Sequence, residues 1–430
     1  MQNKWNDSIV PIDLQLGYTQ KDFGANGFYT PRFPNQHELL HTFFVSLKSD
    51  ATAGRFNISP AVYWRRNYDR FSLDRHAMDA RPPNFHYTDA YGADVIASLV
   101  NRFGRTSAGI LVRNESVFSN VLGKQMEPEE RRKVRGQSDK WYDKSDRRTN
   151  ISAFLEQNIH LGKWSASLGA LANSNNYTNG KVKIYPGIDM AFRPNQLLRI
   201  YASANMATRL PTFTDLYYQT ATHISNPELT PEKSTEYELG TKITSGIGFF
   251  NVSYFYRTIN NAIDWIWLTD QEKWQTMNHT DIYTHGISMG GVWNIGENLP
   301  VQTLSAFYTF MSSSKWAYEY RSNYVMDYLR HKLNLGVTHR IVEKVCAHWQ
   351  IGWQDRNGGF LRYNAETDIF DTEATPYAPF WKIDLRIYRQ TERMNIFVEA
   401  ANLGDKQYQD IGNVLLPGRW IRAGIAFTLK

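Results

Sequence analysis

The stretch "WKIDLRIY" (residues 381–388) alternates apolar and polar side chains with a period of two. That period is typical of a β-strand, in which successive side chains point to opposite faces. "VCAHWQIGW" (345–353) and "IRAGIAFTLK" (421–430) repeat it, and the pattern places Cys346 and His348 on a polar face. Similar segments recur along almost the whole chain. We therefore expect an all-β protein whose strands each have one apolar face.

The polar faces carry many charged side chains. Glu156, Asp189, Arg199 and Arg386 all belong to this set. The core of a soluble protein does not accept so many charges without partners. The polar face must therefore contact water, and the apolar face must contact a hydrophobic environment. A transmembrane antiparallel β-barrel with a wet lumen meets both demands, and its closure removes exposed sheet edges.

Composition agrees with a barrel in a membrane. Mean hydropathy is −0.51, and no run reaches the roughly 18 apolar residues of a membrane helix. Aromatic residues make up 14% of the 430, as expected where aromatic girdles lie at two bilayer interfaces. The single Cys346 excludes a disulfide framework and a cysteine-based zinc site. The net charge of +6 is spread along the chain, which argues against nucleic acid binding.

Connection lengths alternate between short and long. Short turns such as 161–165 and 244–248 alternate with long segments such as 116–146 and 209–232, as in barrels with short periplasmic turns and long external loops. Counting gives about 18 strands, and residues 1–430 are expected to form one barrel domain. A soluble β-sandwich or propeller is the alternative, but we find no blade repeat and no place for the inward charges.

"HELLH" (37–41) matches the H-E-x-x-H pattern of zinc proteases. That pattern binds zinc only on a helix, where His37 and His41 share a face and Glu38 polarises a water. The apolar residues that follow have a period of two, and no third ligand lies nearby. We expect the stretch to begin a descending barrel strand, with no metal site and no catalytic residue.

The segment 207–243, "ATRLPTFTDLYYQTATHISNPELTPEKSTEYELGTKI", resembles the hallmark of TonB-dependent outer-membrane receptors. The residues that carry the resemblance are Arg209, Pro211, Phe213, Asp215, Leu216, Tyr217, Asn226, Pro227, Leu229, Pro231, Glu232, Glu236, Tyr237, Glu238, Leu239 and Gly240. In that family the segment leaves a rising strand, crosses outside and returns on the next. We expect more of these motif residues to stabilise the structure of the segment than to contact a ligand.

Two further stretches support the resemblance. "VEAANLGDKQYQDIGNVLLPGRWIRAGIAFTL" (398–429) is similar to the family's last hairpin and closing strand, and "DFGANGFYTPRFPNQHE" (22–38) resembles an external loop of Bacteroidetes-type receptors, including cobalamin transporters. Family barrels have 22 strands and an N-terminal plug. The resemblance therefore implies that about four strands and the plug are missing before Met1, and that the chain is the C-terminal part of a receptor barrel.

The resemblance implies active uptake of a large, scarce nutrient across the outer membrane of a Gram-negative bacterium. The partners it implies are outer-membrane lipid, a small-molecule nutrient and TonB, which would act through the missing N-terminal part; a surface lipoprotein is a candidate partner. Cobalamin (vitamin B12) is the first choice of ligand, and a ferric siderophore or haem is next. No resident cofactor is expected. A passive 18-stranded porin is the alternative from another class, although a porin has no reason to carry the 207–243 segment.

Aromatic residues on the expected external loops are the candidates for ligand contact. They are Phe28, Tyr29, Tyr217, Tyr218, Trp265, Trp267, Trp316, Tyr318, Phe360 and Tyr363. For each one the more ordinary role is to anchor at the membrane interface or to pack its own loop. His76, His86, His223, His279 and His285 lie in or near the same loops, where a histidine can coordinate haem iron but is more often solvated.

Overall fold

The computed structural model describes residues 11–178, 180–220, 223–267, 273–278, 281–296, 299–315, 321–322 and 327–428, with the backbone alone at 321–322. Most of these residues lie in β-strands, and nearly all of the strand pairings are antiparallel. No helix among them is long and apolar enough to cross a bilayer.

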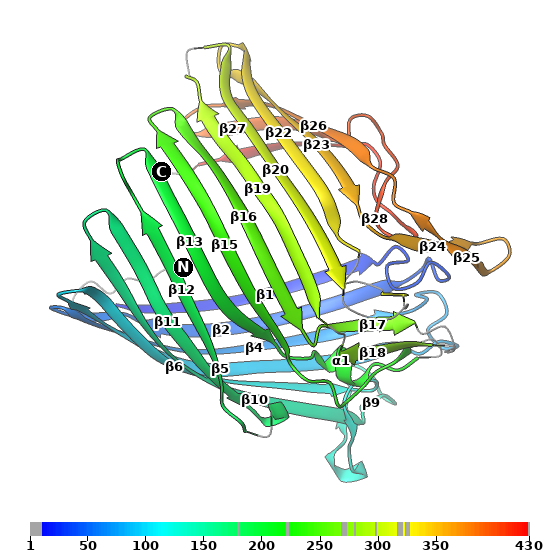
Figure 1. Cartoon of the computed structure of the whole chain (residues 1–430). Coiled ribbons are helices and arrows are strands. Elements are labelled where there is room, and N and C mark those ends of the chain that lie inside the picture. The colour runs from blue at the N-terminus through cyan, green and yellow to red at the C-terminus, as the bar shows by residue number, and fades with distance from the viewer. Residues whose placement is uncertain are drawn as a thin grey trace.

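Eighteen long strands follow one another along the chain and form a single sheet (Figure 1). They are β1 (Ile12–Gly24), β2 (His37–Ser49), β4 (Phe56–Ser72), β5 (Asn84–Asn101), β6 (Gly104–Ser119), β10 (Lys144–Leu161), β11 (Trp164–Asn175), β12 (Lys183–Phe192), β13 (Leu198–Arg209), β15 (Glu232–Ser245), β16 (Gly248–Asn260), β19 (Ile282–Asn294), β20 (Val301–Lys315), β22 (Leu329–Val342), β23 (Val345–Arg356), β26 (Phe380–Gln390), β27 (Met394–Ala401) and β30 (Trp420–Phe427). The short strands β3 (Ala51–Ala53) and β7 (Lys124–Gln125) extend the same sheet.

Each long strand between β1 and β30 pairs antiparallel with the long strands before and after it. Within the described residues β1 pairs only with β2, and β30 only with β27. The curved sheet confirms the all-β barrel class and the expected number of about 18 strands. "HELLH" begins β2, as expected, so Glu38 points to the opposite face from His37 and His41.

The two faces of the sheet differ as the sequence predicts. Val62, Val95, Ile110 and Leu239 share the outer face and are 45–61% exposed, because only lipid can cover them. The opposite face lines the lumen and carries charges that pair across neighbouring strands. Arg257 with Glu236 is one such pair, with 2.5 Å between Nη2 and Oε2.

The long connections gather at one end of the barrel, where they build small structures of their own (Figure 1). These are η1 (Pro128–Glu130), β8 (Arg132–Lys133), β9 (Trp141–Tyr142), η2 (Asn176–Thr178), α1 (Phe213–Tyr217), β14 (His223–Ile224), β17 (Ile263–Trp267), β18 (Trp274–Asn278), β21 (Arg321–Ser322), β24 (Gly359–Asn364), β25 (Ile369–Pro376), β28 (Gln409–Ile411) and β29 (Val414–Leu415). This is the external end of a barrel of this kind.

Several lumen-facing aromatic rings lie across a glycine of the next strand. Tyr201 faces Gly240, Phe44 faces Gly17 and Phe154 faces Gly109, each pair in register. A ring in this position covers the bare backbone of the glycine, which helps to fix strand register. Gly240 of the predicted motif is therefore an architectural residue.

Replacing Gly240 by alanine is expected to destabilise the barrel by about 1–3 kcal/mol, because the new methyl group would collide with the Tyr201 ring. The change should appear as a lower midpoint in thermal unfolding of the protein in detergent. Gly246→Ala is the matched control, since no heavy atom lies within 4 Å of its added methyl. Equal midpoints for the two variants would contradict the packing role.

Candidate functional site

The segment between β13 and β15 begins with a short helix. At the start of α1 the Thr212 hydroxyl accepts a hydrogen bond from the Asp215 amide at 3.1 Å, and the Asp215 carboxylate accepts one from the Thr212 amide at 2.9 Å. This reciprocal capping box satisfies two amides that a helix start otherwise leaves unpaired. A five-residue helix is too short to be stable alone, so its packing must hold it.

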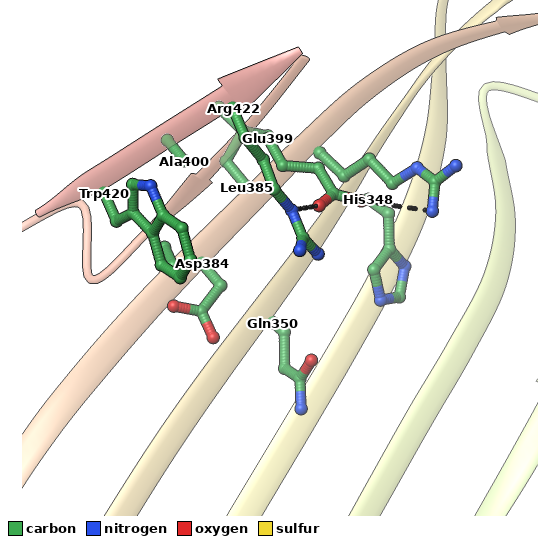
Figure 2. A pocket seen from close by; sticks show the side chains of 10 residues that line it. His348, Gln350, Asp384, Leu385, Glu399, Ala400, Trp420 and Arg422 are labelled. Carbon is green, nitrogen blue, oxygen red and sulfur yellow. Dashed lines mark hydrogen bonds and ion pairs between the residues drawn. The ribbon is translucent and has the colours of Figure 1, made fainter. Parts of the chain in front are cut away.

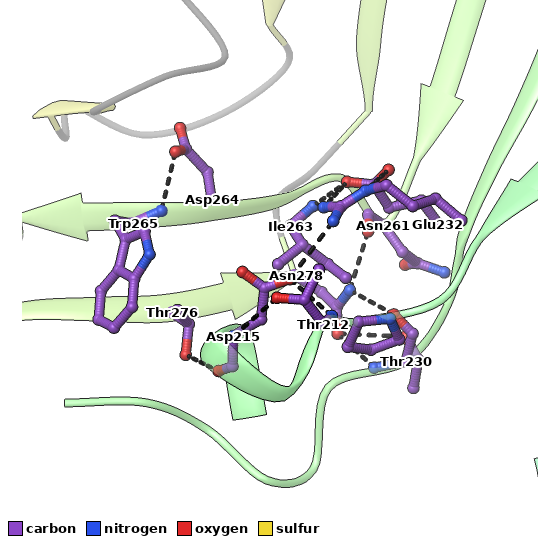
Figure 3. A network of polar contacts seen from close by, with 12 residues as sticks. Thr212, Asp215, Thr230, Glu232, Asn261, Ile263, Asp264, Trp265, Thr276 and Asn278 are labelled. Atoms are coloured by element: carbon purple, nitrogen blue, oxygen red, sulfur yellow. Dashed lines mark hydrogen bonds and ion pairs between the residues drawn. The ribbon is translucent and has the colours of Figure 1, made fainter. Parts of the chain in front are cut away.

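Figure 3 shows the polar network around Asp215, Glu232 and Ile263, in which Arg209 joins the two ends of the segment. Its guanidinium donates to both carboxylate oxygens of Glu232, at 2.7 and 2.8 Å, and to Asp215 Oδ2 at 3.3 Å. Glu232 Oε1 also accepts a hydrogen bond from the Ile263 amide at 2.6 Å. One ion-paired network thus joins the last residue of β13, helix α1, the first residue of β15 and strand β17.

The β17–β18 hairpin completes a compact external module. Thr276 donates to the Asp215 carbonyl at 2.9 Å, and Asn278 exchanges hydrogen bonds with the backbone of Thr230 at 2.8 and 2.9 Å. Leu216, Leu229 and Ile263 form its buried core. We call residues 209–232 together with β17 and β18 the loop module.

An aromatic cluster belongs to this module. His223 lies between Tyr218 and Trp265, with ring centroids 6.1 and 4.9 Å away, and Trp265 lies 6.3 Å from Tyr218. Burial lowers the pKa of His223 and raises the pKa of Tyr218, so both side chains are neutral at pH 7. Trp267 contacts Trp274 at 5.6 Å in the same hairpin. Trp265 is buried at 8% exposed, whereas Tyr218 and His223 are half-buried, so these two side chains are the part of the cluster that a ligand could contact.

Tyr217 points elsewhere, against the lumen wall. Its hydroxyl donates to Asp146 Oδ2 at 2.6 Å, and Tyr177 donates to the same oxygen. Burial, and then the bond to Asp146, raise the pKa of Tyr217. Nearby, Arg148 donates to the Pro211 carbonyl at 2.7 Å and also pairs with Glu115. These contacts anchor the loop module to β6 and β10.

The remaining candidates lie on two other loops. Phe28 is 50% exposed and meets Tyr29 edge to face at 5.1 Å, and the Tyr29 hydroxyl donates to Glu38 at 2.6 Å. Phe360 packs on Tyr377, and Tyr363 packs on Phe370. Trp316 and Tyr318 lie outside the described residues.

The loop that carries Phe28 and Tyr29 also contacts the last external loops. Arg32 Nε donates to Asp368 Oδ1 at 2.7 Å, and the Tyr363 hydroxyl donates to the same oxygen at 2.8 Å. These bonds lower the pKa of Asp368, the bond from Tyr363 most of all. Asn26 donates to the Leu415 carbonyl at 3.1 Å. The loop after β1 is thus joined to the loops near β24, β25 and β29 without strand pairing.

The lumen wall holds a polar cavity of about 400 Å³ next to β30 (Figure 2). Glu399 lies between two arginines there: Arg386 Nη1 is 3.2 Å from Glu399 Oε1, and Arg422 Nε bonds to Glu399 Oε2. A second cavity of about 210 Å³ shares Gln350 and Asp384 with the first. Together they form a charged surface that faces the interior.

Several histidines each bond to a different side chain. His37 bonds to Asp22 at 2.6 Å, His41 to Tyr18 at 2.8 Å and His86 to Ser119 at 2.7 Å. The part of the chain that the structure describes contains no group of three or more His, Cys, Asp or Glu side chains that could hold a metal ion.

The family model described as "TonB dependent receptor-like, beta-barrel" matches residues 2–403. The chain belongs to this family. Proteins of the family are outer-membrane proteins of Gram-negative bacteria, so the apolar outer face is the face toward lipid. The barrel class and the outer-membrane location predicted from the sequence are thereby confirmed.

Solved structures share the fold at low sequence identity. The FrpB iron transporter of Neisseria meningitidis (apoprotein form) superposes with a TM-score of 0.73 at 14% identity, over 98% of this chain and 69% of its own. A mutant of the ferric enterobactin receptor PfeA from Pseudomonas aeruginosa gives a TM-score of 0.73 at 12% identity, over 97% and 67%. The vitamin B12 transporter BtuB of Photobacterium profundum is 25% identical over 120 residues, which are 28% of this chain and 19% of that relative.

The family motif residues lie in the loop module and on β15. Pro211, Leu216, Leu229 and Pro231 are buried in the loop module. Asn226 Oδ1 accepts from the Glu228 amide at 2.9 Å, across Pro227, and so shapes the turn before Leu229. On β15, Tyr237 is 51% exposed on the lipid face, and Glu238 accepts from Tyr201 in the lumen at 3.2 Å.

Sequence reasoning missed the residues that hold this module. Asp146 and Arg148 of β10, and Ile263, Thr276 and Asn278 of the β17–β18 hairpin, are remote from the motif in sequence, and nothing in the motif points to them. In this hairpin the sequence indicated only Trp265 and Trp267. A local signal did exist for the helix start, because Thr212 and Asp215 have the spacing of a capping box.

Proposed function

We propose that this chain is the barrel part of a receptor that takes up a large, scarce nutrient by TonB-dependent active transport across the outer membrane, and that cobalamin is the nutrient. One observation carries the proposal. The family segment builds a fixed external module whose cluster of Tyr218, His223 and Trp265 lies at the end of the barrel that carries the long loops. A nutrient from outside meets this end first.

The choice of cobalamin rests on two stretches that resemble cobalamin receptors, "FGANGFY" (23–29) and "YQDIGNVLLPGRW" (408–420). They are far apart in sequence but touch in the structure, through the bond from Asn26 to Leu415. The weak match to BtuB points the same way. The solved neighbours share only the fold, and a ferric siderophore is the second candidate because their names identify them as iron receptors.

The barrel also needs further strands in this proposal. A sheet edge exposed to lipid leaves backbone groups without partners, and β1 and β30 each pair on one side within the described residues. We propose that the complete receptor places further strands between them and a plug in the lumen. TonB would act through that plug, and a surface lipoprotein remains a candidate partner at the external end.

Binding of cyanocobalamin to the detergent-solubilised full-length receptor tests the ligand, measured by isothermal titration calorimetry. We expect near-stoichiometric heat at micromolar protein. Tyr218→Ala should weaken the affinity about tenfold, because an aromatic contact contributes about 1.5 kcal/mol. Tyr237→Ala is the control, since Tyr237 is on the lipid face.

Two other outcomes decide between the alternatives. Binding of a ferric catecholate, with no heat from cyanocobalamin, would move the assignment to a siderophore receptor. Large, steady ion conductance in a planar bilayer, with no binding of either compound, would contradict active uptake and favour a passive channel.

A further inference from the structure

The loop between β6 and β10 folds back onto the outside of the barrel. Its strands β8 and β9 place Val134 and Tyr142 against Phe85 and Tyr87, and all four side chains are buried. Tyr87 also stacks on Phe118 at 4.7 Å. We call residues 124–144 the outer-wall hairpin.

Strand register shows which wall this hairpin covers. Tyr87 lies on the same face of β5 as Tyr91 and Val95, which are 46% and 45% exposed, and Phe118 lies on the same face of β6 as Ile110. These exposed residues contact lipid, so the hairpin packs on the lipid-facing wall above them. It therefore lies outside the barrel and away from the lumen.

An ion pair marks the depth at which the hairpin meets the bilayer. Arg66 pairs with Asp89 through two bonds, one of them 2.7 Å long, on this same outer face. Trp64 donates to Asp89 at 3.1 Å. Charged side chains on a lipid face are costly near the bilayer centre and accepted at its edge, where Trp is also enriched. The hairpin packs on Tyr87, which is the next residue beyond Asp89 on the same face of β5 toward the external end, and this position fits the edge of the bilayer.

The hairpin presents a cationic surface at that level. Arg131, Lys133 and Arg135 are exposed, and none of them forms an ion pair with a carboxylate of the described residues. The Arg132 side chain faces the barrel wall instead: its guanidinium lies 3.9 Å from the Phe118 ring centroid and donates to the Tyr87 hydroxyl. Trp141 is 45% exposed beside Lys133. The same loop also carries exposed acids: Glu129 and Glu130 of η1 directly precede Arg131, and Asp139 pairs with Lys140 at 3.3 Å.

We propose that the outer-wall hairpin binds a phosphorylated glycolipid of the outer leaflet, with Arg131, Lys133 and Arg135 against its phosphates and Trp141 at the boundary of its acyl chains. Basic side chains next to an anionic membrane surface are each attracted to it. Guanidinium groups suit phosphate because they donate two parallel hydrogen bonds. The lipid wall below the hairpin supplies the position in which such a molecule would sit.

Native mass spectrometry of the full-length receptor with added diphosphoryl lipid A tests this proposal. We expect the triple variant Arg131→Gln, Lys133→Gln, Arg135→Gln to bind at least tenfold more weakly than the wild type. The matched control replaces three exposed cations at the opposite end of the barrel, Arg102, Arg105 and Lys163, by Gln. It should bind as the wild type does.

A second probe separates headgroup from acyl-chain binding. Lipid A without its phosphates should bind the wild type as weakly as diphosphoryl lipid A binds the triple variant. Equal binding of the two lipids by the wild type, or of diphosphoryl lipid A by the wild type and the triple variant, would overturn the proposal. Heat-modifiable migration on gels shows that each variant is folded, so a loss of binding cannot come from unfolding.

Discussion

Leu216→Ala is expected to lower the free energy of unfolding of the loop module by about 3 kcal/mol while the barrel strands remain intact. Leu216 is 1% exposed and packs with Leu229 and Ile263, so its truncation leaves a cavity in a small core. Helix α1 has only five residues and depends on that contact.

Hydrogen exchange followed by mass spectrometry measures this effect locally. A loss of about 3 kcal/mol should speed exchange of the amides in 212–232 by roughly a hundredfold, since each 1.4 kcal/mol is a factor of ten. Ile224→Ala is the control in the same segment, because Ile224 is 38% exposed and leaves little cavity. Unchanged exchange in the Leu216 variant would show that the module does not depend on this core. Faster exchange throughout β13 and β15 would show that it is not a separate unit.

Arg209→Ala is expected to cost the loop module about 2–3 kcal/mol. The substitution removes hydrogen bonds to Glu232 and Asp215, whose carboxylates are only 15% and 16% exposed, and leaves two negative charges without this partner. The Arg209 side chain is itself 45% exposed, so water offsets part of the loss. We therefore expect an external protease to cut between 210 and 231 in the variant and not in the wild type.

Arg257→Ala is the matched control for this experiment. Arg257 is 43% exposed and bonds to Glu236 through Nε and Nη2, and this pair joins two neighbouring strands of the lumen wall. The strand ladder between β15 and β16 holds that position without it. Cleavage of both variants at equal rates would mean that the network does not fix the segment.

Much of the barrel could be predicted from the sequence, because successive residues of each strand alternate between side chains that suit water and side chains that suit lipid. Water on one face and lipid on the other impose a period of two, which assigned Cys346 and His348 to the lumen side; in the structure His348 bonds to Thr338 there, at 2.9 Å. Strand ends were harder to predict. Residues 116–146 were expected to be external, yet β6 continues to Ser119 and β10 begins at Lys144, because barrel strands extend beyond the bilayer.

The candidate site was less predictable, because its aromatic residues have similar sequence contexts but different structural roles. Tyr217 and Tyr218 are neighbours, but Tyr217 bonds to Asp146 on the lumen wall while Tyr218 joins the cluster with His223 and Trp265. The alternation of a strand does not extend into a loop, so no periodic pattern distinguishes the two.

The sequence by itself determined the strands, their faces, their order and the external segment at 207–243, because each of these depends on neighbours in the chain and on contact with water or lipid. Only the tertiary structure decided what the loops do. Three contacts show this: the bond from Arg148 to the Pro211 carbonyl spans 63 positions, the contact between Asn26 and Leu415 spans 389, and the packing of Tyr142 on Tyr87 spans 55. Such contacts are set by where the strand ladder places each loop, and local sequence carries no record of that placement.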